Sequence, residues 1–141
     1  MSGEHPELFN RLKGGVMAKQ SIAIVGLGKM GSAFLEELLG QSNEGVEIVA
    51  VVENNNTAGL ALAKARGIDN LSIDELVRMG EDLDILFDLT DVPTVRQELR
   101  DKLRAAGNRH TIIATENIAH MVWTLIARGT DIPRTPASPA Y

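Results

Sequence analysis

Three glycines form the pattern in this chain with the clearest chemical meaning. Gly26, Gly28 and Gly31 follow the apolar run 21–25 and open an amphipathic segment over residues 29–39. A strand, a glycine-rich turn and a helix in this order begin a dinucleotide-binding βαβ unit. The first glycine permits a tight turn, the second lets a pyrophosphate approach the backbone, and the third lets helix and strand pack closely. The anion would then contact free N–H groups at the helix N-terminus.

An acidic residue follows the second apolar run, at the sequence position that binds the adenosine ribose in such units. The second apolar run, residues 46–52, ends in Glu53, about 20 residues beyond Gly31, as the dinucleotide pattern requires. A carboxylate there accepts hydrogen bonds from ribose hydroxyls and repels a 2′-phosphate. We therefore predict NAD as the cofactor, with NADP less favoured, although the asparagines at 54–56 would soften that preference. A nucleotide-free fold that keeps the glycines for packing is the alternative.

Loops at the carboxyl ends of parallel strands face the ligand in such folds. Polar residues in these loops are therefore further candidates for cofactor binding. Thr90 is suited to bind a cofactor ribose or phosphate, and Asp91 to add a second polar contact. Both also serve as ordinary helix-entry residues, and for Asp91 the capping role is favoured over binding. Asn117 is suited equally to contact the nicotinamide ribose or to cap the last helix. The predicted cofactor-binding residues are Gly26, Leu27, Gly28, Lys29, Met30, Gly31, Glu53, Thr90 and Asn117.

No catalytic residue is predicted. Glu116 and His120 are four residues apart, a spacing that on one helix suits a proton-transfer pair or two metal ligands. No third ligand of suitable spacing accompanies them, so solvated or capping roles are expected and no metal site. The chain lacks G-x-S-x-G and G-K-[ST] motifs, which excludes serine hydrolase and P-loop chemistry of those types.

Composition narrows the class of protein. A chain of 141 residues with 44% apolar and 23% charged residues supports one globular domain with its own core. The formal net charge of −5 argues against a nucleic-acid partner. The absence of cysteine excludes disulfides, thiolate metal sites and cysteine nucleophiles. No apolar stretch approaches the ~20 residues of a membrane span or forms a signal core, so no membrane contact and a cytoplasmic location are expected.

Strand-like and helix-like runs alternate along the chain, which predicts an α/β fold with a doubly wound parallel sheet of order 3-2-1-4-5 in a single domain. Thr57 should cap a helix that stops at Gly67, and Ser72 with Glu75 should form a capping box. Asp91 and Pro93 should start another helix. Strands are expected over residues 21–25, 46–52, 70–71, 84–89 and 110–115.

The last predicted helix carries an apolar stripe that must be covered, formed by Ile118, Met121, Val122, Leu125 and Ile126. No sixth strand follows, so we expect the edge beside the fifth strand to be closed by this helix, by a second copy as a homodimer, or by a partner protein. The predicted organisation is a flexible arm over residues 1–20, a dinucleotide-binding domain over 21–129 and a disordered tail over 130–141.

Residues 21 to about 126 resemble the NAD(P)-binding domain shared by the glucose-fructose oxidoreductase/inositol dehydrogenase family, homoserine and aspartate dehydrogenases, and dihydrodipicolinate reductase. The likeness lies in residues 24–31, 51–53, 72–77 and 87–90. It implies cofactor binding by the three glycines and Glu53. These enzymes have a catalytic lysine near the fifth strand or in a separate segment, whereas residues 114–118 contain none, and their C-terminal substrate domain is expected to be missing.

Three functional hypotheses follow. The first is an NAD(H)-binding domain without its own catalytic domain, which senses the dinucleotide or regulates a partner. The second is the cofactor-binding part of an NAD(P)-dependent dehydrogenase or reductase that another domain or subunit completes. The third is a CoA-binding domain, which Glu53 disfavours because the CoA ribose carries a 3′-phosphate.

Overall fold

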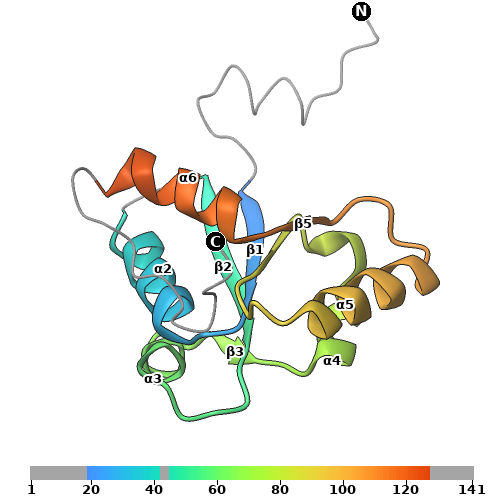
Figure 1. The fold of residues 1–141 in the computed structure, drawn as a ribbon, viewed down its shortest axis with the longest axis horizontal. Helices are drawn as coiled ribbons and strands as arrows, with labels where there is room; N and C mark the ends of the chain where they lie inside the picture. The colour runs from blue at the N-terminus through green and yellow to red at the C-terminus, as the bar shows by residue number, and fades with distance from the viewer. Residues whose placement is uncertain (1–18, 42–44, 128–141) are drawn as a thin grey trace, which may run out of the picture.

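The five strands form one parallel sheet of order β3-β2-β1-β4-β5, as the sequence predicts (Figure 1). The computed structural model describes residues 19–41 and 45–127. The predictions for residues 1–18 and 130–141 lie outside this part of the chain. The elements are β1 (Gln20–Val25), α2 (Lys29–Gly40), β2 (Val46–Val52), α3 (Ala58–Ala65), β3 (Asp69–Asn70), α4 (Ile73–Arg78), the short 3₁₀ helix η1 (Gly80–Asp82), β4 (Ile85–Asp88), α5 (Pro93–Ala105), β5 (Ile112–Ala114) and α6 (Glu116–Ile126).

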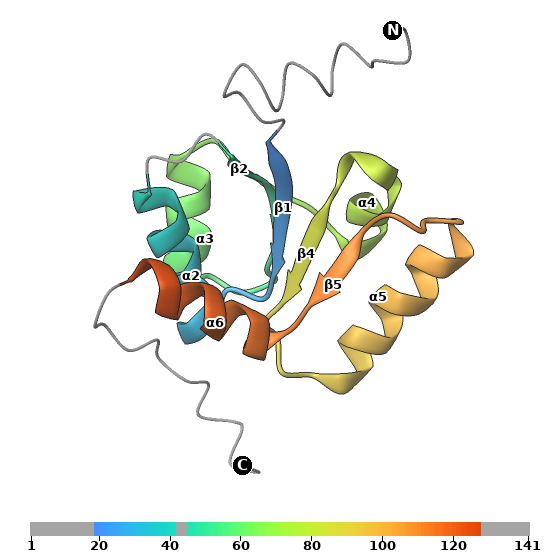
Figure 2. The ribbon, with the colours of Figure 1, turned by 90° about the horizontal axis from the view of Figure 1, so that it is seen from above.

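Helices cover both faces of the sheet, with α2, α3 and α6 on one side and α4 and α5 on the other (Figure 2). The central strand β1 alternates between them, because Ile22 and Ile24 pack with the first group while Ala23 and Val25 pack with the second. Burial on both faces explains why the central strands are nearly continuous apolar runs. The order of the strands reverses between β1 and β4, which leaves a crevice at their carboxyl ends.

The helix caps predicted at Thr57 and Ser72 form in the structure. The Thr57 hydroxyl accepts the N–H of Leu60 at 3.1 Å, and α3 is followed by Gly67 with φ of +74°. Ser72 and Glu75 form the predicted capping box at the start of α4. These predictions succeed because a cap involves residues within one turn of each other.

The predicted cap at Asp91 is wrong, and Asn117 does not take the capping role, which is one of its two alternatives. Asp91 does not cap α5, whose N-cap is Val92; Asp91 instead adopts a left-handed backbone with φ of 58°. The Thr90 hydroxyl accepts the N–H of Val92 at 3.1 Å, and Pro93 at the first helical position has no N–H to satisfy. Asn117 does not cap α6, because Thr115 is the N-cap and Asn117 lies inside the first turn.

Helix α6 is rotated relative to the predicted stripe. Ala119 and Trp123 are its buried residues, and they pack against the core shared with α2. Trp123 offers the largest apolar surface on this helix, so its burial sets which side faces inward. Three of the residues expected to be covered, Ile118, Met121 and Leu125, are exposed. None of the helices in the described ranges has the length and apolar character required to cross a bilayer.

Candidate functional site

A cleft of about 400 Å³ lies at the carboxyl ends of β1, β2 and β4, where the strand order reverses. Its volume falls in the range typical of small-molecule sites. It brings together four of the predicted residues, Gly26, Gly28, Glu53 and Thr90. The complete lining is Val25, Gly26, Gly28, Val52, Glu53, Asn54, Asn55, Thr57, Ile73, Leu89, Thr90, Val92 and Val95.

Two of the three glycines are required by packing. Gly26 has φ of +97°, and a Cβ there would lie 2.8 Å from the Thr90 methyl group. A Cβ on Gly31 would lie 2.0 Å from the carbonyl oxygen of Gly26, so the helix could not approach the turn. The turn is held to β2 by the Gly26 N–H, which donates to the Val52 carbonyl at 2.9 Å.

Gly28 differs, because a Cβ there would meet no atom of the described residues within 4 Å. It is the N-cap of α2, and this helix end has neither a side-chain cap nor an acidic residue in its first turn. By contrast, α4 has a capping box and two acidic residues in its first turn. The N–H groups at the start of α2 therefore present their partial positive charge to open space in front of Gly28.

The Glu53 carboxylate contacts the glycine-rich turn directly. Oε1 accepts the Leu27 N–H at 2.6 Å, and Oε2 accepts the Asn55 N–H at 3.0 Å. Each carboxylate oxygen keeps a further lone pair that can accept a hydrogen bond. Glu53 is also the one ionisable residue among those described that line the cleft. The cleft is therefore acidic on the β2 side.

Asn70, at the end of β3, holds the backbone of Glu53. Its Oδ1 accepts the Glu53 N–H at 3.0 Å and its Nδ2 donates to the Glu53 carbonyl at 2.9 Å. Sequence reasoning missed this residue, and the available signal was an asparagine at the carboxyl end of a predicted strand. Glu53 is thus fixed both at its backbone and at its carboxylate.

The other predicted residues occupy different positions. The side chains of Leu27 and Met30 are buried in the core, so only their backbone groups are available to a ligand. Lys29 is exposed at the start of α2 and Asn117 is exposed on α6, and neither lines the cleft. Cofactor contacts by these four residues stay predictions.

A buried ion-pair network lies behind Thr90. Asp88 is fully buried, and its Oδ1 accepts both the N–H of Thr90 at 3.1 Å and its hydroxyl at 2.7 Å. Its Oδ2 accepts the Nε of Arg96 at 3.0 Å, and Arg96 reaches Glu116 Oε1 at 3.1 Å. Because the Thr90 hydroxyl already donates to Asp88, it can offer a ligand only an acceptor.

This network corrects the expectation that Glu116 is solvated or a cap. Arg96 on α5 draws it into an ion pair, and its Oε2 is buried without a hydrogen-bond partner in the described chain. His120 is exposed. No group of three His, Cys, Asp or Glu residues suited to a metal ion occurs within residues 19–41 and 45–127.

Comparison with known proteins gives one family. The model described as "Homoserine dehydrogenase, NAD binding domain" matches residues 26–117, which include the glycine-rich turn, Glu53, Thr90 and Glu116. No curated protein sequence matches the chain.

Solved structures share the fold at low sequence identity. A putative myo-inositol dehydrogenase from Sinorhizobium meliloti 1021 has a TM-score of 0.53 and 19% identity, covering 77% of this chain and 34% of that one. RSP in complex with β-NADH has a TM-score of 0.52 and 17% identity, with coverages of 85% and 65%. The S. aureus homoserine dehydrogenase has a TM-score of 0.48 and 16% identity, with coverages of 77% and 30%. This chain thus spans about a third of the length of the two dehydrogenases.

Proposed function

We propose, from the premise that this chain belongs to the family of homoserine dehydrogenase NAD-binding domains, that its cleft binds a nicotinamide adenine dinucleotide. The observation that carries the proposal is the space in front of Gly28, at the uncapped N-terminus of α2. A helix N-terminus with nearby space for an anion suits a pyrophosphate. The remaining lone pairs of Glu53 suit ribose hydroxyls.

The predicted residues would contact the dinucleotide in two ways, some through backbone N–H groups and the others through their side chains. The glycine-rich turn would let the pyrophosphate approach, and the N–H groups at the start of α2 would hold it, since the Gly26 and Leu27 N–H groups already donate to Val52 and Glu53. Glu53 would accept the adenosine ribose hydroxyls, and Thr90 would accept a hydrogen bond from the ligand. Asn117, at the start of α6, would contact the nicotinamide ribose.

We favour NAD over NADP because of the charge of the cleft. A 2′-phosphate at the adenosine ribose would lie beside the Glu53 carboxylate and be repelled by it. No lysine or arginine among the described residues lines the cleft to neutralise that phosphate. The same reasoning disfavours CoA, which carries a 3′-phosphate on its ribose.

We propose that the domain binds without turnover and has a sensing or regulatory role. A bound nicotinamide supplies or accepts a hydride, but a dehydrogenase also needs a group that moves a proton on the substrate. The turn after β5 contains Thr115, Glu116 and Asn117, and Glu116 is engaged by Arg96. Helix α6 begins at this turn and exposes Ile118, Met121 and Leu125, which offers a route to a partner.

A second candidate is the cofactor-binding part of a dehydrogenase or reductase that another domain or subunit completes. Its support is the family itself, together with the 34% of the myo-inositol dehydrogenase structure that this chain covers. This candidate expects hydride exchange only when the completing partner is present, whereas the first expects none.

The test is isothermal titration of the full chain with NADH, NAD, NADPH and CoA, using two matched glycine variants. Gly28→Ala and Gly40→Ala lie at opposite ends of α2, and neither added Cβ meets an atom of the described residues within 4 Å. We expect Gly28→Ala to weaken NADH binding about tenfold, roughly 1.4 kcal/mol, and Gly40→Ala to leave it unchanged. Equal affinities in both variants, or no dinucleotide binding by the unaltered chain, would contradict the proposal.

A further inference from the structure

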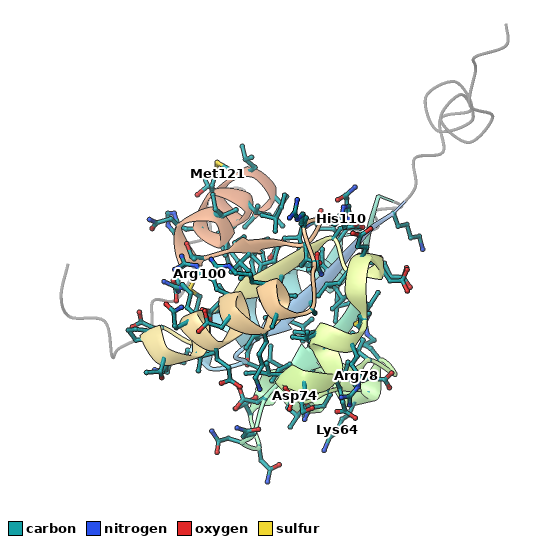
Figure 3. All side chains as sticks on the ribbon, turned by 90° about the vertical axis from the view of Figure 1, so that its right-hand side faces the viewer. Lys64, Asp74, Arg78, Arg100, His110 and Met121 are labelled. Atoms are coloured by element: carbon teal, nitrogen blue, oxygen red, sulfur yellow. The ribbon has the colours of Figure 1, made fainter. Side chains whose placement is uncertain are left out.

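A second hollow, of about 570 Å³, lies between α5, the loop that follows it and β5. It shares no lining residue with the cleft described above. Three arginines, Arg100, Arg104 and Arg109, surround it, and the half-buried Ile113 provides apolar surface beside the buried Leu103. Figure 3 faces this side of the molecule and shows Arg100 on α5, beside the strand at the sheet edge.

The three arginines have no carboxylate at salt-bridge distance within the described residues. Other cations of the same helix are neutralised, since Arg96 pairs with Asp88 and Glu116, and Lys102 pairs with Asp74 and Glu98. An unneutralised cluster of three guanidinium groups is unusual on a chain whose net charge is −5. It creates a local positive potential that attracts an anionic ligand.

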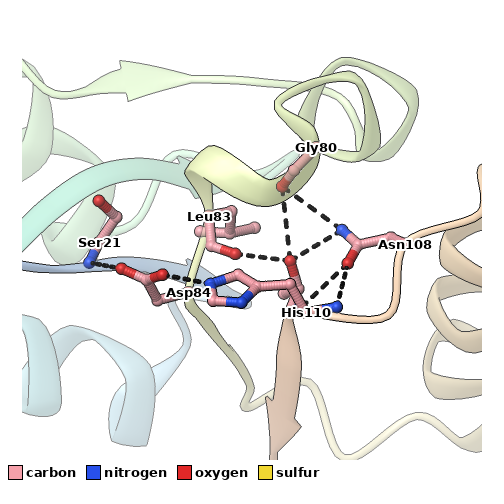
Figure 4. Close-up of polar contacts among 7 residues, drawn as sticks. Ser21, Gly80, Leu83, Asp84, Asn108 and His110 are labelled. Carbon is pink, nitrogen blue, oxygen red and sulfur yellow. Dashed lines mark hydrogen bonds and ion pairs between the residues drawn. The ribbon is translucent and has the colours of Figure 1, made fainter. Parts of the chain in front are cut away.

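The loop that carries Arg109 is held in one conformation by its neighbours (Figure 4). Asn108 Oδ1 accepts the N–H groups of His110 at 2.8 Å and Thr111 at 2.9 Å. The Thr111 hydroxyl donates to the Leu83 carbonyl at 2.5 Å, and the His110 ring contacts the Asp84 carboxylate at 2.5 Å. A fixed loop lowers the entropy lost when the hollow binds a ligand.

Strand β5 adds a backbone edge to this surface. It pairs with β4 on one side, and no other strand of the described residues pairs with it. The Ile112 N–H donates toward β4, to the Asp84 carbonyl at 2.9 Å, so alternation turns the backbone groups of Ile113 to the free side. The Ile112 side chain, which alternation places on the face of β5 opposite to Ile113, is 62% exposed. The surface thus combines apolar groups, main-chain hydrogen-bonding groups and three cations.

We propose that this surface binds an extended segment of a partner protein in which acidic and apolar residues alternate. Its carboxylates would pair with the three arginines, whose guanidinium forks match carboxylate geometry. Its apolar side chains, which alternation turns to the opposite face of the sheet, would pack against the exposed Ile112, and its backbone would pair with the free side of β5.

Charge argues against two other occupants. Residues 1–18 and 128–141 carry no excess of acidic over basic side chains, so neither segment complements the arginines. A second copy that paired β5 with β5 around a two-fold axis would bring both sets of arginines to the same interface, and like charges repel. A separate acidic partner removes that repulsion.

The experiment measures fluorescence anisotropy of a labelled peptide of about ten residues that alternates valine and glutamate, titrated with the full chain. A peptide with glutamine in place of glutamate reports the contribution of charge. We expect the glutamate peptide to bind at least about tenfold more tightly than the glutamine peptide, because paired charges supply much of the attraction. Equal binding of the two peptides, or no binding of either, would overturn the proposal.

Two double variants with the same change in charge localise the site. Arg100→Glu with Arg104→Glu alters the hollow, whereas Lys64→Glu with Arg66→Glu alters exposed residues at the end of α3, near the opposite sheet edge. The first should abolish peptide binding and the second should weaken it less than about twofold. An equal loss of peptide affinity in both double variants would show that only the net charge of the protein matters, and it would overturn the proposal.

Two further measurements separate the remaining occupants. Citrate or inorganic phosphate that displaces the peptide at equal concentration would indicate a small-anion pocket. Sedimentation that shows a dimer dissociated by the arginine variant would indicate a second copy. Either result overturns the partner proposal. NADH titration of the same variant should be unchanged, since the two sites share no lining residue, so this test is independent of the proposed cofactor function.

Discussion

The Asn70 side chain and the Glu53 backbone form a reciprocal pair of hydrogen bonds, at 3.0 Å to the N–H and 2.9 Å from the amide to the carbonyl. The pair ties the end of β3 to the end of β2. From this fixed backbone the Glu53 carboxylate reaches the Leu27 N–H on β1's glycine-rich turn at 2.6 Å. Asn70 is therefore a positioning residue for the group that we propose to select the cofactor.

Asn70→Ala should lower both the affinity for NADH and the preference for NADH over NADPH. Each lost hydrogen bond contributes about 1 kcal/mol, so a three- to tenfold weaker NADH affinity is expected. The selectivity falls because a less constrained Glu53 repels the 2′-phosphate less effectively. Parallel titrations with both nucleotides measure the ratio.

Asn108→Ala is the matched control, because the Asn108 side chain also accepts hydrogen bonds from backbone N–H groups but does not line the cleft. It should lower stability while the ratio of NADH to NADPH affinities stays constant. A constant ratio in Asn70→Ala as well would assign Asn70 a purely structural role.

Glu53→Gln should shift the cofactor preference toward NADPH. The substitution keeps the length of the side chain and one acceptor oxygen, but it removes the charge that opposes a 2′-phosphate. We expect the ratio of NADPH to NADH affinity to rise by about tenfold, equivalent to roughly 1.4 kcal/mol. Binding of the two nucleotides measured calorimetrically at constant salt checks this, and an unaltered ratio would show that Glu53 does not contact the ribose region.

Gly31→Ala should destabilise the fold itself. The added Cβ would lie 2.0 Å from the Gly26 carbonyl oxygen, so α2 must move away from the turn. Overpacking typically costs about 1–3 kcal/mol, and a clash with backbone atoms places the expected loss near the upper limit. Urea unfolding followed by circular dichroism measures it, with Gly40→Ala as the control that adds a Cβ in open space of the same helix. Equal stabilities of the two variants would contradict the close approach seen at Gly31.

Asp88→Ala should also destabilise the protein, by a different mechanism. Asp88 is fully buried and accepts hydrogen bonds from Thr90 and Arg96, so its removal leaves these donors without their partner. Breaking a buried pair costs about 3–5 kcal/mol, and the partial exposure of Arg96 places the expected loss near the lower limit. Denaturant unfolding checks the prediction against Asp101→Asn, an exposed position on α5 where a change within about 0.5 kcal/mol is expected.

The ion pair between α4 and α5 should respond to acid. A hydrogen bond from Lys102, which contacts Asp74 at 2.6 Å, lowers the pKa of Asp74 from its ordinary value of 3.8. The folded-state pKa lies below the unfolded one, so the stabilisation is complete above pH 3.8 and is lost as the pH falls through the lowered pKa. An NMR titration of the Asp74 carboxyl measures this, and Lys102→Met should return its pKa toward the ordinary value.

The sequence by itself determined the architecture and the central part of the candidate site. Alternating apolar runs predict the strand order, because a chain whose strands are buried on both faces must cross over through helices. The glycine spacing and Glu53 predict which edge carries the site. The caps at Thr57 and Ser72 are also readable, since they depend on residues within one helical turn.

Only the tertiary structure decided which side chains support that site. Asn70 and Glu53 are 17 residues apart, and Arg96 and Glu116 are 20 apart, so neither contact follows any local periodicity. The rotation of α6 likewise depends on where Trp123 finds space in the core, and so it leaves Met121 exposed. Local patterns specify elements, but hydrogen bonds and packing between distant elements form only after the sheet has brought their residues together.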